Sequence, residues 1–175
     1  MREEVSGSRR LGAHYWVIDG ELAGRAGPAC VPWNLFDLRD DGIDAVVSLD
    51  DDVDERELAA AEIRHFPLYQ PMVLLDSEKD QRAFLSSVMP PAVRFIDDCR
   101  ADGMGVMVHC HYGCDRTGAV LACYLVAREG MKAWEAYEHI RRVNPHSFGA
   151  SGYAESILTF ARMLEENPGW FESRE

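Results

Sequence analysis

The sequence predicts a single α/β domain with a central, mostly parallel sheet of four to five strands flanked by helices. Two observations support this fold class. Short, nearly continuous apolar runs such as DAVVSL and GVMVHC alternate with longer segments of helical period, and strands that are apolar throughout are typical of a parallel sheet covered on both faces. The chain has 175 residues, of which 47% are hydrophobic, and this is enough for one sizeable core.

The first half of the chain is expected to form a strand pair followed by alternating strands and helices. HYWVIDGELAG is typical of a hairpin that turns at Asp19-Gly20. VPWNLFDLRDDG predicts a helix with Pro32 near its start and Gly42 at its C-terminal cap. DAVVSL then predicts a strand, DERELAAAE a short helix and IRHFPL the next strand. The acidic run LDDDVDERE is interpreted as a solvated face and a helix N-terminus.

The second half is expected to be mainly helical around one buried strand, GVMVHC. A helical pattern from Gln81 to Val88 is predicted to stop at Pro90-Pro91, because proline lacks the amide that a helix interior needs. Pro91 then opens a new helix, PAVRFIDDCRADG. Three further helices are predicted over Thr117 to Arg128, Lys132 to Val143 and Ala154 to Glu166.

We assign residues 10–167 to a single domain, because no repeat, low-complexity tract or linker divides them. The polar segments 1–9 and 168–175 are expected to be frayed tails. Thirty acidic residues against eighteen basic ones give a net charge of −12. This balance argues against nucleic-acid binding and against adhesion to anionic membranes. Any anionic ligand must therefore be bound at a local positive site.

The composition also bears on the compartment. No apolar run is long enough to span a bilayer, and the N-terminus MREEVSGSRR has no hydrophobic signal region. The five cysteines are an odd number and are expected to be free thiols in a reducing environment. These features predict a cytoplasmic protein, and nothing in the sequence indicates an oligomeric state.

The segment VMVHCHYGCDRTGAVLACYLVAREG places polar and reactive side chains between an apolar strand and an apolar helix. Cys110 and Arg116 are separated by five residues. A loop of this length can turn successive N–H groups toward one point, to which the next helix adds the positive end of its dipole. Arg116 contributes a planar pair of donors that matches two oxygens of a tetrahedral anion. The segment therefore predicts a binding site for phosphate or sulfate.

The same field favours the ionised form of a cysteine placed beneath it. Such a thiolate below a bound phosphoryl group is positioned for in-line attack, which makes Cys110 the predicted nucleophile. Gly113 permits the tight curl of the loop. Thr117 can cap the helix locally or donate its hydroxyl to the thiolate. His109 is expected to fix the backbone around the cysteine.

His109-Cys110, five intervening residues and Arg116-Thr117-Gly118 resemble the signature loop of the cysteine-dependent protein tyrosine phosphatases. The flanking stretches YWVIDGELAGRAGP, GIDAVVSLD, ACYLV and IRRVNP resemble the small atypical dual-specificity phosphatases. The Asp-Arg-Thr ending of the loop is similar to that of the myotubularin-type phosphoinositide phosphatases.

The resemblance implies hydrolysis of phosphomonoesters through a phosphocysteine, on phosphotyrosine with or without phosphoserine and phosphothreonine in proteins or peptides. Cys110 takes the phosphoryl group, and the loop holds the phosphate oxygens as charge spreads in the transition state. The implied substrate-binding residues are His111, Tyr112, Gly113, Cys114, Asp115 and Arg116. No metal and no other cofactor is implied, because the arginine and the amides stabilise the charge.

The sequence departs from this family's pattern at the general acid. The aspartate that protonates the leaving oxygen is expected just after IRHFPL, where this chain has Tyr69 and Gln70. Three substitutes are available: Asp115 inside the loop is placed first, Asp76 second and Asp80 third. A glutamine that positions the hydrolytic water is expected near the last helix, but HSFGASGYAES contains none.

Several alternatives stay open. The loop ending CDRTG favours phosphoinositide or inositol-phosphate hydrolysis, although HYGCD lacks the lysines that such loops often carry. The missing acid favours a catalytically weak phosphate-binding module. A metal site at His109, Cys110, His111 and Cys114 lacks a second ligand pair. For Cys114 two interpretations stay open: it forms a disulfide with Cys110 on oxidation, or it lines the pocket wall.

Overall fold

The computed structural model describes residues 13–170 and residue 172. The strands are β1 Tyr15–Ile18, β2 Leu22–Ala26, β3 Ile43–Ser48, β4 Arg64–Pro67 and β5 Gly105–Cys110. They form one five-stranded sheet in the order β1-β2-β5-β3-β4. The β1–β2 pair is antiparallel and the other neighbouring strands are parallel. The single α/β domain with a mostly parallel sheet is therefore confirmed, as is the hairpin at Asp19-Gly20.

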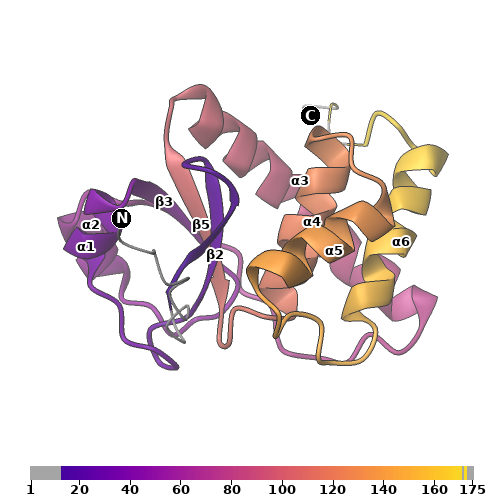
Figure 1. The fold of residues 1–175 in the computed structure, drawn as a ribbon, viewed down its shortest axis with the longest axis horizontal. Helices are drawn as coiled ribbons and strands as arrows, with labels where there is room; N and C mark the ends of the chain where they lie inside the picture. Colours follow the sequence, from indigo (N-terminus) through magenta and orange to yellow (C-terminus); the bar gives the residue numbers. More distant parts are fainter. Residues whose placement is uncertain (1–12, 171, 173–175) are drawn as a thin grey trace, which may run out of the picture.

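The helices are α1 Leu35–Asp40, α2 Glu55–Ala60, α3 Glu78–Ala101, α4 Arg116–Arg128, α5 Ala133–Val143 and α6 Tyr153–Glu166. Figure 1 shows α1 and α2 on one side of the sheet and the larger group, α3 to α6, on the other. Successive side chains of a strand point to opposite faces, which divides the core in two. Met107 of β5 packs with the small cluster under α1 and α2, whereas Val106 and Val108 join the large cluster.

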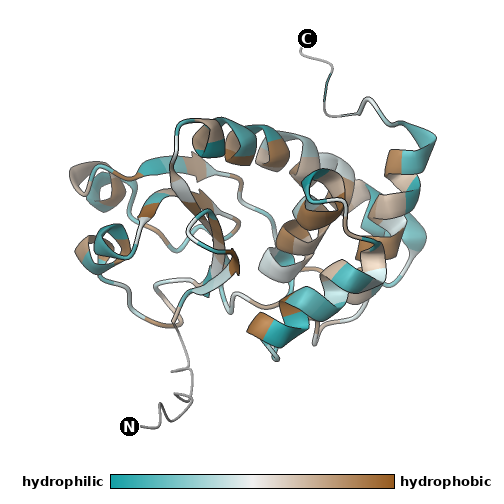
Figure 2. Ribbon diagram, turned by 45° about the horizontal axis from the view of Figure 1, so that its top comes forward, coloured by the Kyte–Doolittle hydropathy of each residue, from teal (hydrophilic) through white to brown (hydrophobic). Residues whose placement is uncertain are grey.

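Helix α4 is the centre of the large layer. Its first ten residues, Arg116 to Leu125, are all buried. A helix that is apolar around its whole circumference belongs inside a protein, and Figure 2 shows this central helix in brown where α5 in front of it carries a teal outer surface. Because α4 contacts both β2 and β5, its N-terminus is held firmly at the carboxyl end of the sheet.

The predicted helix break at Pro90-Pro91 is wrong. Helix α3 runs through both prolines as one helix of 24 residues. The two lost amides and the ring clashes make this costly, but the buried positions continue at helical spacing on both sides, through Val88, Ala92 and Ile96. Burial of this continuous apolar face outweighs the local preference, which single-residue rules do not capture.

The start of α1 and the C-terminal segment also differ from expectation. Helix α1 begins at Leu35, after Pro32, because the Asn34 side chain accepts hydrogen bonds from two amides of the first turn and acts as the cap. Residues 1–9 lie outside the described residues. Within the segment 168–175, expected to be frayed, Trp170 instead packs on the core with its ring 5.9 Å from that of Phe160.

Helices long and apolar enough to cross a bilayer are absent from the described part of the chain.

The packing of the core predicts a difference in stability between two substitutions. Ile96 on α3 is fully buried, whereas Leu158 on α6 is 50% exposed. We expect Ile96→Ala to lower the free energy of unfolding by about 2–5 kcal/mol, because it leaves a cavity between the helices and the sheet. Leu158→Ala, the matched control, should cost less than about 1 kcal/mol. Urea unfolding of the two variants measures this, and equal losses would contradict the assigned packing of α3.

Candidate active site

Cys110 is the last residue of β5 and opens into a pocket at the carboxyl end of the sheet. The position follows from the parallel pairing, which sets Cys110 beside Ala26 of β2 and His109 beside Ser48 of β3. Only 2% of Cys110 is exposed. The pocket has a volume of about 410 Å³ and is lined by Asp50, Met72, Cys110, His111, Tyr112, Asp115 and Arg116. The predicted nucleophile therefore lies on the floor of a pocket that also holds the predicted arginine.

The loop after Cys110 is curled and tied down by its carbonyl groups. Gly113 has a φ of +71°, in the left-handed region that glycine tolerates. The Gly113 carbonyl accepts hydrogen bonds from the Tyr15 hydroxyl at 2.6 Å and from the Asn144 amide at 3.3 Å. The His111 carbonyl accepts one from the Gly27 amide at 3.0 Å. With these carbonyls bonded outside the loop, the curl can present its N–H groups to an anion.

Arg116 is buried, and only one end of its guanidinium is used by the protein. The side chain is 5% exposed. Its Nη1 donates to the Gln70 carbonyl at 2.6 Å and faces Asp50 Oδ1 at 3.4 Å. Its Nε is buried without a hydrogen-bond partner among the described residues. A buried donor without a partner costs free energy. Because no described protein atom accepts from Nε, this edge of the guanidinium is available to the oxygens of a tetrahedral anion.

A second buried donor lies on the next residue. The Thr117 hydroxyl has no hydrogen-bond partner among the described residues, and the whole residue is buried. This leaves the hydroxyl available for the role expected from the sequence, donation to a thiolate at Cys110.

His109 is held by a chain of hydrogen bonds that fixes its tautomer. Its Nε2 lies 2.6 Å from Ser48 Oγ, which also lies 2.8 Å from His65 Nε2. Its Nδ1 lies 3.4 Å from the Cys110 carbonyl, so Nδ1 carries the proton that this acceptor needs. The Ser48 hydroxyl then donates its one hydrogen bond to His109 Nε2. His65 must therefore donate to the Ser48 oxygen through its own Nε2–H. Burial lowers the pKa of His109 to about 4, which keeps it neutral.

The three candidate acids lie in different places. Asp115 lines the pocket, and its Oδ1 accepts a hydrogen bond from the Ala150 amide at 3.1 Å. Asp76 is exposed, is not part of the pocket lining, and accepts from the Ser151 hydroxyl at 2.6 Å. Asp80 lies in the first turn of α3 beside a separate hollow. The structure therefore brings Asp115 to Cys110 and Arg116, and it does not bring Asp76 or Asp80 there.

Two carboxylates of the site were assigned to a solvated face from the sequence, and this interpretation is wrong. Asp50 lines the pocket with 23% of its side chain exposed, and Asp52 is 12% exposed. The Asp52 Oδ2 accepts from the Ala29 amide at 3.0 Å. Both residues follow β3 directly, at the carboxyl end of a central parallel strand where ligands bind. That position was the signal available in the sequence.

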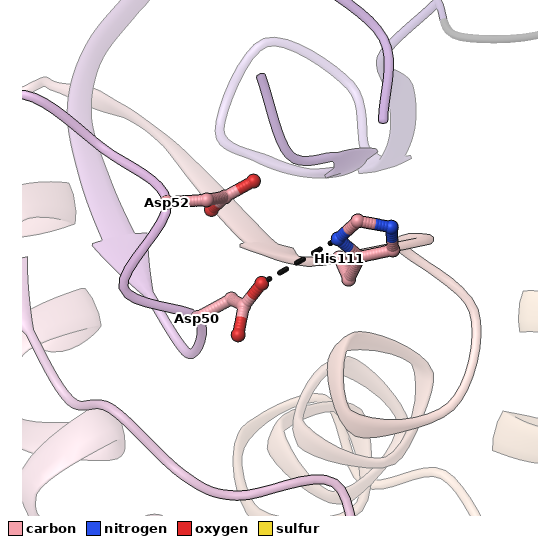
Figure 3. A group of neighbouring side chains, drawn as sticks. All are labelled: Asp50, Asp52 and His111. Carbon is pink, nitrogen blue, oxygen red and sulfur yellow. Dashed lines mark ion pairs between the residues drawn. The ribbon is translucent and has the colours of Figure 1, made fainter. Parts of the chain in front are cut away.

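Asp50, Asp52 and His111 form a group whose potential ligand atoms all lie within 4.8 Å of one another (Figure 3). Of the four residues considered for a metal from the sequence, only His111 belongs to it. His109 is turned to Ser48. A structural zinc site takes four ligands, so these three do not complete one. The described interaction within the group is the ion pair of His111 Nδ1 with Asp50 Oδ2 at 3.7 Å.

Cys114 lies on the other side of the loop. It lines a second cavity of about 880 Å³ together with Cys30, whereas Cys110 opens into the smaller pocket. Burial raises the pKa of the Cys114 thiol, and its Sγ donates to the Tyr112 carbonyl at 3.4 Å. Both Cys110 and Cys114 are free thiols. A disulfide between them on oxidation stays a prediction.

A strand that ends in a buried cysteine, a curled loop and an arginine on the next helix define a phosphatase-type active site. The family model described as "dual specificity phosphatase, catalytic domain" matches residues 36–163, and the chain belongs to this family. The chain is 28% identical over 129 residues to dual specificity protein phosphatase 12 of Rattus norvegicus, a match that covers 74% of this chain and 36% of the relative. The chain thus spans only about a third of that relative's length.

Solved structures show the same fold. A mouse putative dual specificity phosphatase complexed with zinc tungstate aligns with a TM-score of 0.72 and 17% identity, over 95% of this chain and 97% of that chain. PTPMT1 in complex with PI(5)P aligns with a TM-score of 0.68 and 16% identity, over 89% of this chain and 98% of that chain. The recognition of the atypical dual-specificity phosphatase fold from the sequence is confirmed.

The curl at Gly113 can be tested against a matched glycine. A Cβ added at Gly113 would lie 2.4 Å from the Arg25 carbonyl carbon and 2.5 Å from the Ala26 nitrogen. Gly130 has nearly the same φ, +68°, and open space around it. We expect Gly130→Ala to cost about 1–2 kcal/mol of backbone strain and to bind vanadate normally, whereas Gly113→Ala also loses vanadate binding. Calorimetry measures the binding, and unchanged affinity in Gly113→Ala would refute this curl.

The neutral state of His109 predicts a pH dependence of stability. Burial lowers its pKa from 6.5 to about 4, so the unfolded chain takes up a proton that the folded chain does not. The free energy of unfolding should therefore fall as the pH drops from about 6.5 to about 4. In His109→Asn this fall should be shallower, while the exposed His146→Asn should behave as the wild type. Urea unfolding across this range is the measurement, and parallel slopes in all three proteins would contradict a buried neutral His109.

Proposed function

We propose that the protein hydrolyses phosphomonoesters of phosphorylated proteins or peptides, on phosphotyrosine and also on phosphoserine and phosphothreonine, through a phosphocysteine at Cys110. One observation carries the proposal: the buried Cys110 shares its pocket with a buried Arg116 whose Nε has no partner among the described residues. A pure binding module needs the arginine and the loop, but it does not need the thiol.

In the first step the phosphate dianion enters the curl between Cys110 and Arg116. Its oxygens accept from the N–H groups of the loop and from the free edge of the guanidinium. The Cys110 sulfur attacks phosphorus from the floor of the pocket, opposite the leaving oxygen, and the Thr117 hydroxyl stabilises the sulfur anion. These donors bind more tightly as charge spreads over the equatorial oxygens, which lowers the barrier.

The rim of the pocket supports an aryl phosphate. Tyr112 is 68% exposed and Met72 is 48% exposed, and both line the pocket. An aromatic ring and a thioether can pack against the ring of a phosphotyrosine while its phosphate reaches the floor. The half-exposed Met72 and the exposed Tyr112 at the rim can move aside for a shorter phosphoserine as well.

A phosphoinositide or inositol phosphate is the second candidate substrate. The Asp115-Arg116-Thr117 ending favours it, and PTPMT1, crystallised with PI(5)P, shares the fold. Multiply phosphorylated headgroups favour several cations, whereas the loop carries His111 and Arg116 as its basic residues. The protein substrate therefore has the stronger support.

The domain and location proposals follow the same reasoning. We propose that residues 10–167 form one catalytic domain, supported by the shared core of the described part. We also propose a cytoplasmic location, supported by five cysteines that are all free thiols.

The function is tested by removing the nucleophile. We expect Cys110→Ser to reduce turnover of an aryl phosphate to background while vanadate still binds. Arg116→Ala should lose about 10³-fold in kcat because the guanidinium stabilises the transition state. Cys30→Ser, a half-exposed thiol outside the pocket, should retain activity. Acid-quenched reaction with labelled substrate should trap phosphate on Cys110.

The substrate class is tested with phosphotyrosine, phosphoserine and soluble phosphoinositide compared by kcat/KM. Preference for the phosphoinositide would support the second candidate. Full activity in Cys110→Ser would end the proposal as a whole.

A further inference from the structure

The proposed reaction needs a proton donor for the leaving oxygen, and the inference here rests on that proposed function. When phosphoserine or phosphothreonine is cleaved, the side-chain oxygen leaves as an alkoxide unless it takes up a proton as its bond to phosphorus breaks. The aspartate expected for this task is absent at Tyr69 and Gln70. The donor must therefore be one of the titratable groups that line the pocket with Cys110.

The carboxylates in the pocket are already engaged. Both oxygens of Asp50 face nitrogen atoms, Oδ1 toward Arg116 Nη1 at 3.4 Å and Oδ2 toward His111 Nδ1 at 3.7 Å. Asp115 Oδ1 accepts from the Ala150 amide, which ties the start of α4 to the segment before α6. Asp115 thus has a structural contact that explains its presence, and the proton donor can come from another residue.

We propose that His111 donates this proton through Nε2, with Asp50 as its positioning residue. His111 is the first residue after the nucleophile and lines the same pocket. Asp50 faces the Nδ1 side of the ring (Figure 3), and a carboxylate on one ring nitrogen directs the other nitrogen to its task. Among the described residues, Nε2 has no hydrogen-bond or ion-pair partner.

The His111 ring is held on two sides but keeps some freedom to move. The His111 side chain is 37% exposed, and its ring lies edge-on to that of Tyr112 with the centroids 4.5 Å apart. The distance of 3.7 Å to Asp50 is that of an ion pair and longer than a hydrogen bond. Catalytic contacts of this kind often tighten only when the substrate is bound.

Each of the two chemical steps moves one proton, away from His111 in the first and back onto it from water in the second. In the first, the Cys110 thiolate forms the S–P bond, the bond from phosphorus to the leaving oxygen breaks, and that oxygen takes the proton from His111 Nε2. In the second, neutral His111 accepts a proton from water as the water oxygen attacks phosphorus. The S–P bond then breaks, the thiolate returns, and inorganic phosphate leaves with His111 protonated again.

The proposal gives a pH dependence with a definite sign. Histidine is the side chain that exchanges its proton between about pH 5 and 8. The charged and titratable groups facing His111 are Asp50 and Asp52 from the segment after β3, and Cys110, Tyr112, Asp115 and Arg116 around the pocket. Since His111 must be protonated in the first step, turnover of substrates with poor leaving groups should fall toward alkaline pH.

The experiment compares substrates with different leaving groups in His111→Gln. This variant removes the acidic imidazole and keeps a polar side chain. Substrates are p-nitrophenyl phosphate, whose leaving group needs little protonation, and phenyl phosphate and a phosphoserine peptide, whose leaving groups need it. We expect kcat to fall about 100-fold on the poor leaving groups and only a few-fold on p-nitrophenyl phosphate. The basic limb of the pH profile should disappear. All assays contain a chelator, so that no cation at Asp50, Asp52 and His111 contributes.

Matched variants separate the possible outcomes. Asp50→Asn should shift the basic limb of the pH profile while keeping part of the leaving-group effect, and His146→Gln on an exposed loop should match the wild type. If His111→Gln keeps the wild-type dependence on the leaving group, the assignment is overturned. A loss confined to Asp50→Asn or to Asp115→Asn overturns it too, because that carboxyl is then the donor. A wild type without Cys110-dependent turnover would instead defeat the proposed function, a result the same assays distinguish.

Discussion

The buried guanidinium of Arg116 is the constraint on which the rest of the site depends. A cation taken out of water in a low-dielectric interior costs several kcal/mol unless it is paired and hydrogen-bonded. The protein supplies the partners from two other segments: Asp50 and the Leu49 carbonyl after β3, and the Gln70 carbonyl after β4. All of them approach Nη1. The fold thus pairs one end of the cation and leaves its buried Nε without a hydrogen-bond partner among the described residues, which is the edge that would hold an oxyanion in the proposed reaction.

The loop depends on the fold in the same way, through long-range contacts. Tyr15 reaches Gly113 across 98 residues of sequence, and Asn144 reaches it from the end of α5. Burial raises the pKa of Tyr15 well above its usual range, which keeps its hydroxyl a donor. The N-terminal hairpin and the helical layer therefore meet at one carbonyl. Disturbing either element would alter the direction of the loop amides without touching the catalytic residues.

The fold class and the centre of the site can be predicted from the sequence because both depend on residues close together in the chain. Apolar strands alternate with helices, and Cys110 and Arg116 are joined by a short loop of fixed length. What the sequence does not show is long-range. The prolines in α3 are tolerated because the core packs on both sides of them. Asp50 contacts Arg116 across 66 residues of sequence, and Asp76 accepts a hydrogen bond from Ser151 across 75 residues. No spacing rule predicts these partners.

The segment after β4 is where the family's general acid is expected, and here it has another task. Its backbone continues the sheet edge, since the Gln70 amide donates to the Leu49 carbonyl at 2.8 Å and the Gln70 carbonyl accepts from Arg116 at 2.6 Å. The Tyr69 hydroxyl turns away to Glu55. Here the segment contributes main-chain atoms that hold the arginine, and the side chains of Tyr69 and Gln70 are not part of the lining of the Cys110 pocket, to which the segment contributes Met72. The proposed donor instead directly follows β5: His111 lines the pocket and faces Asp50, which lies two residues beyond the end of β3.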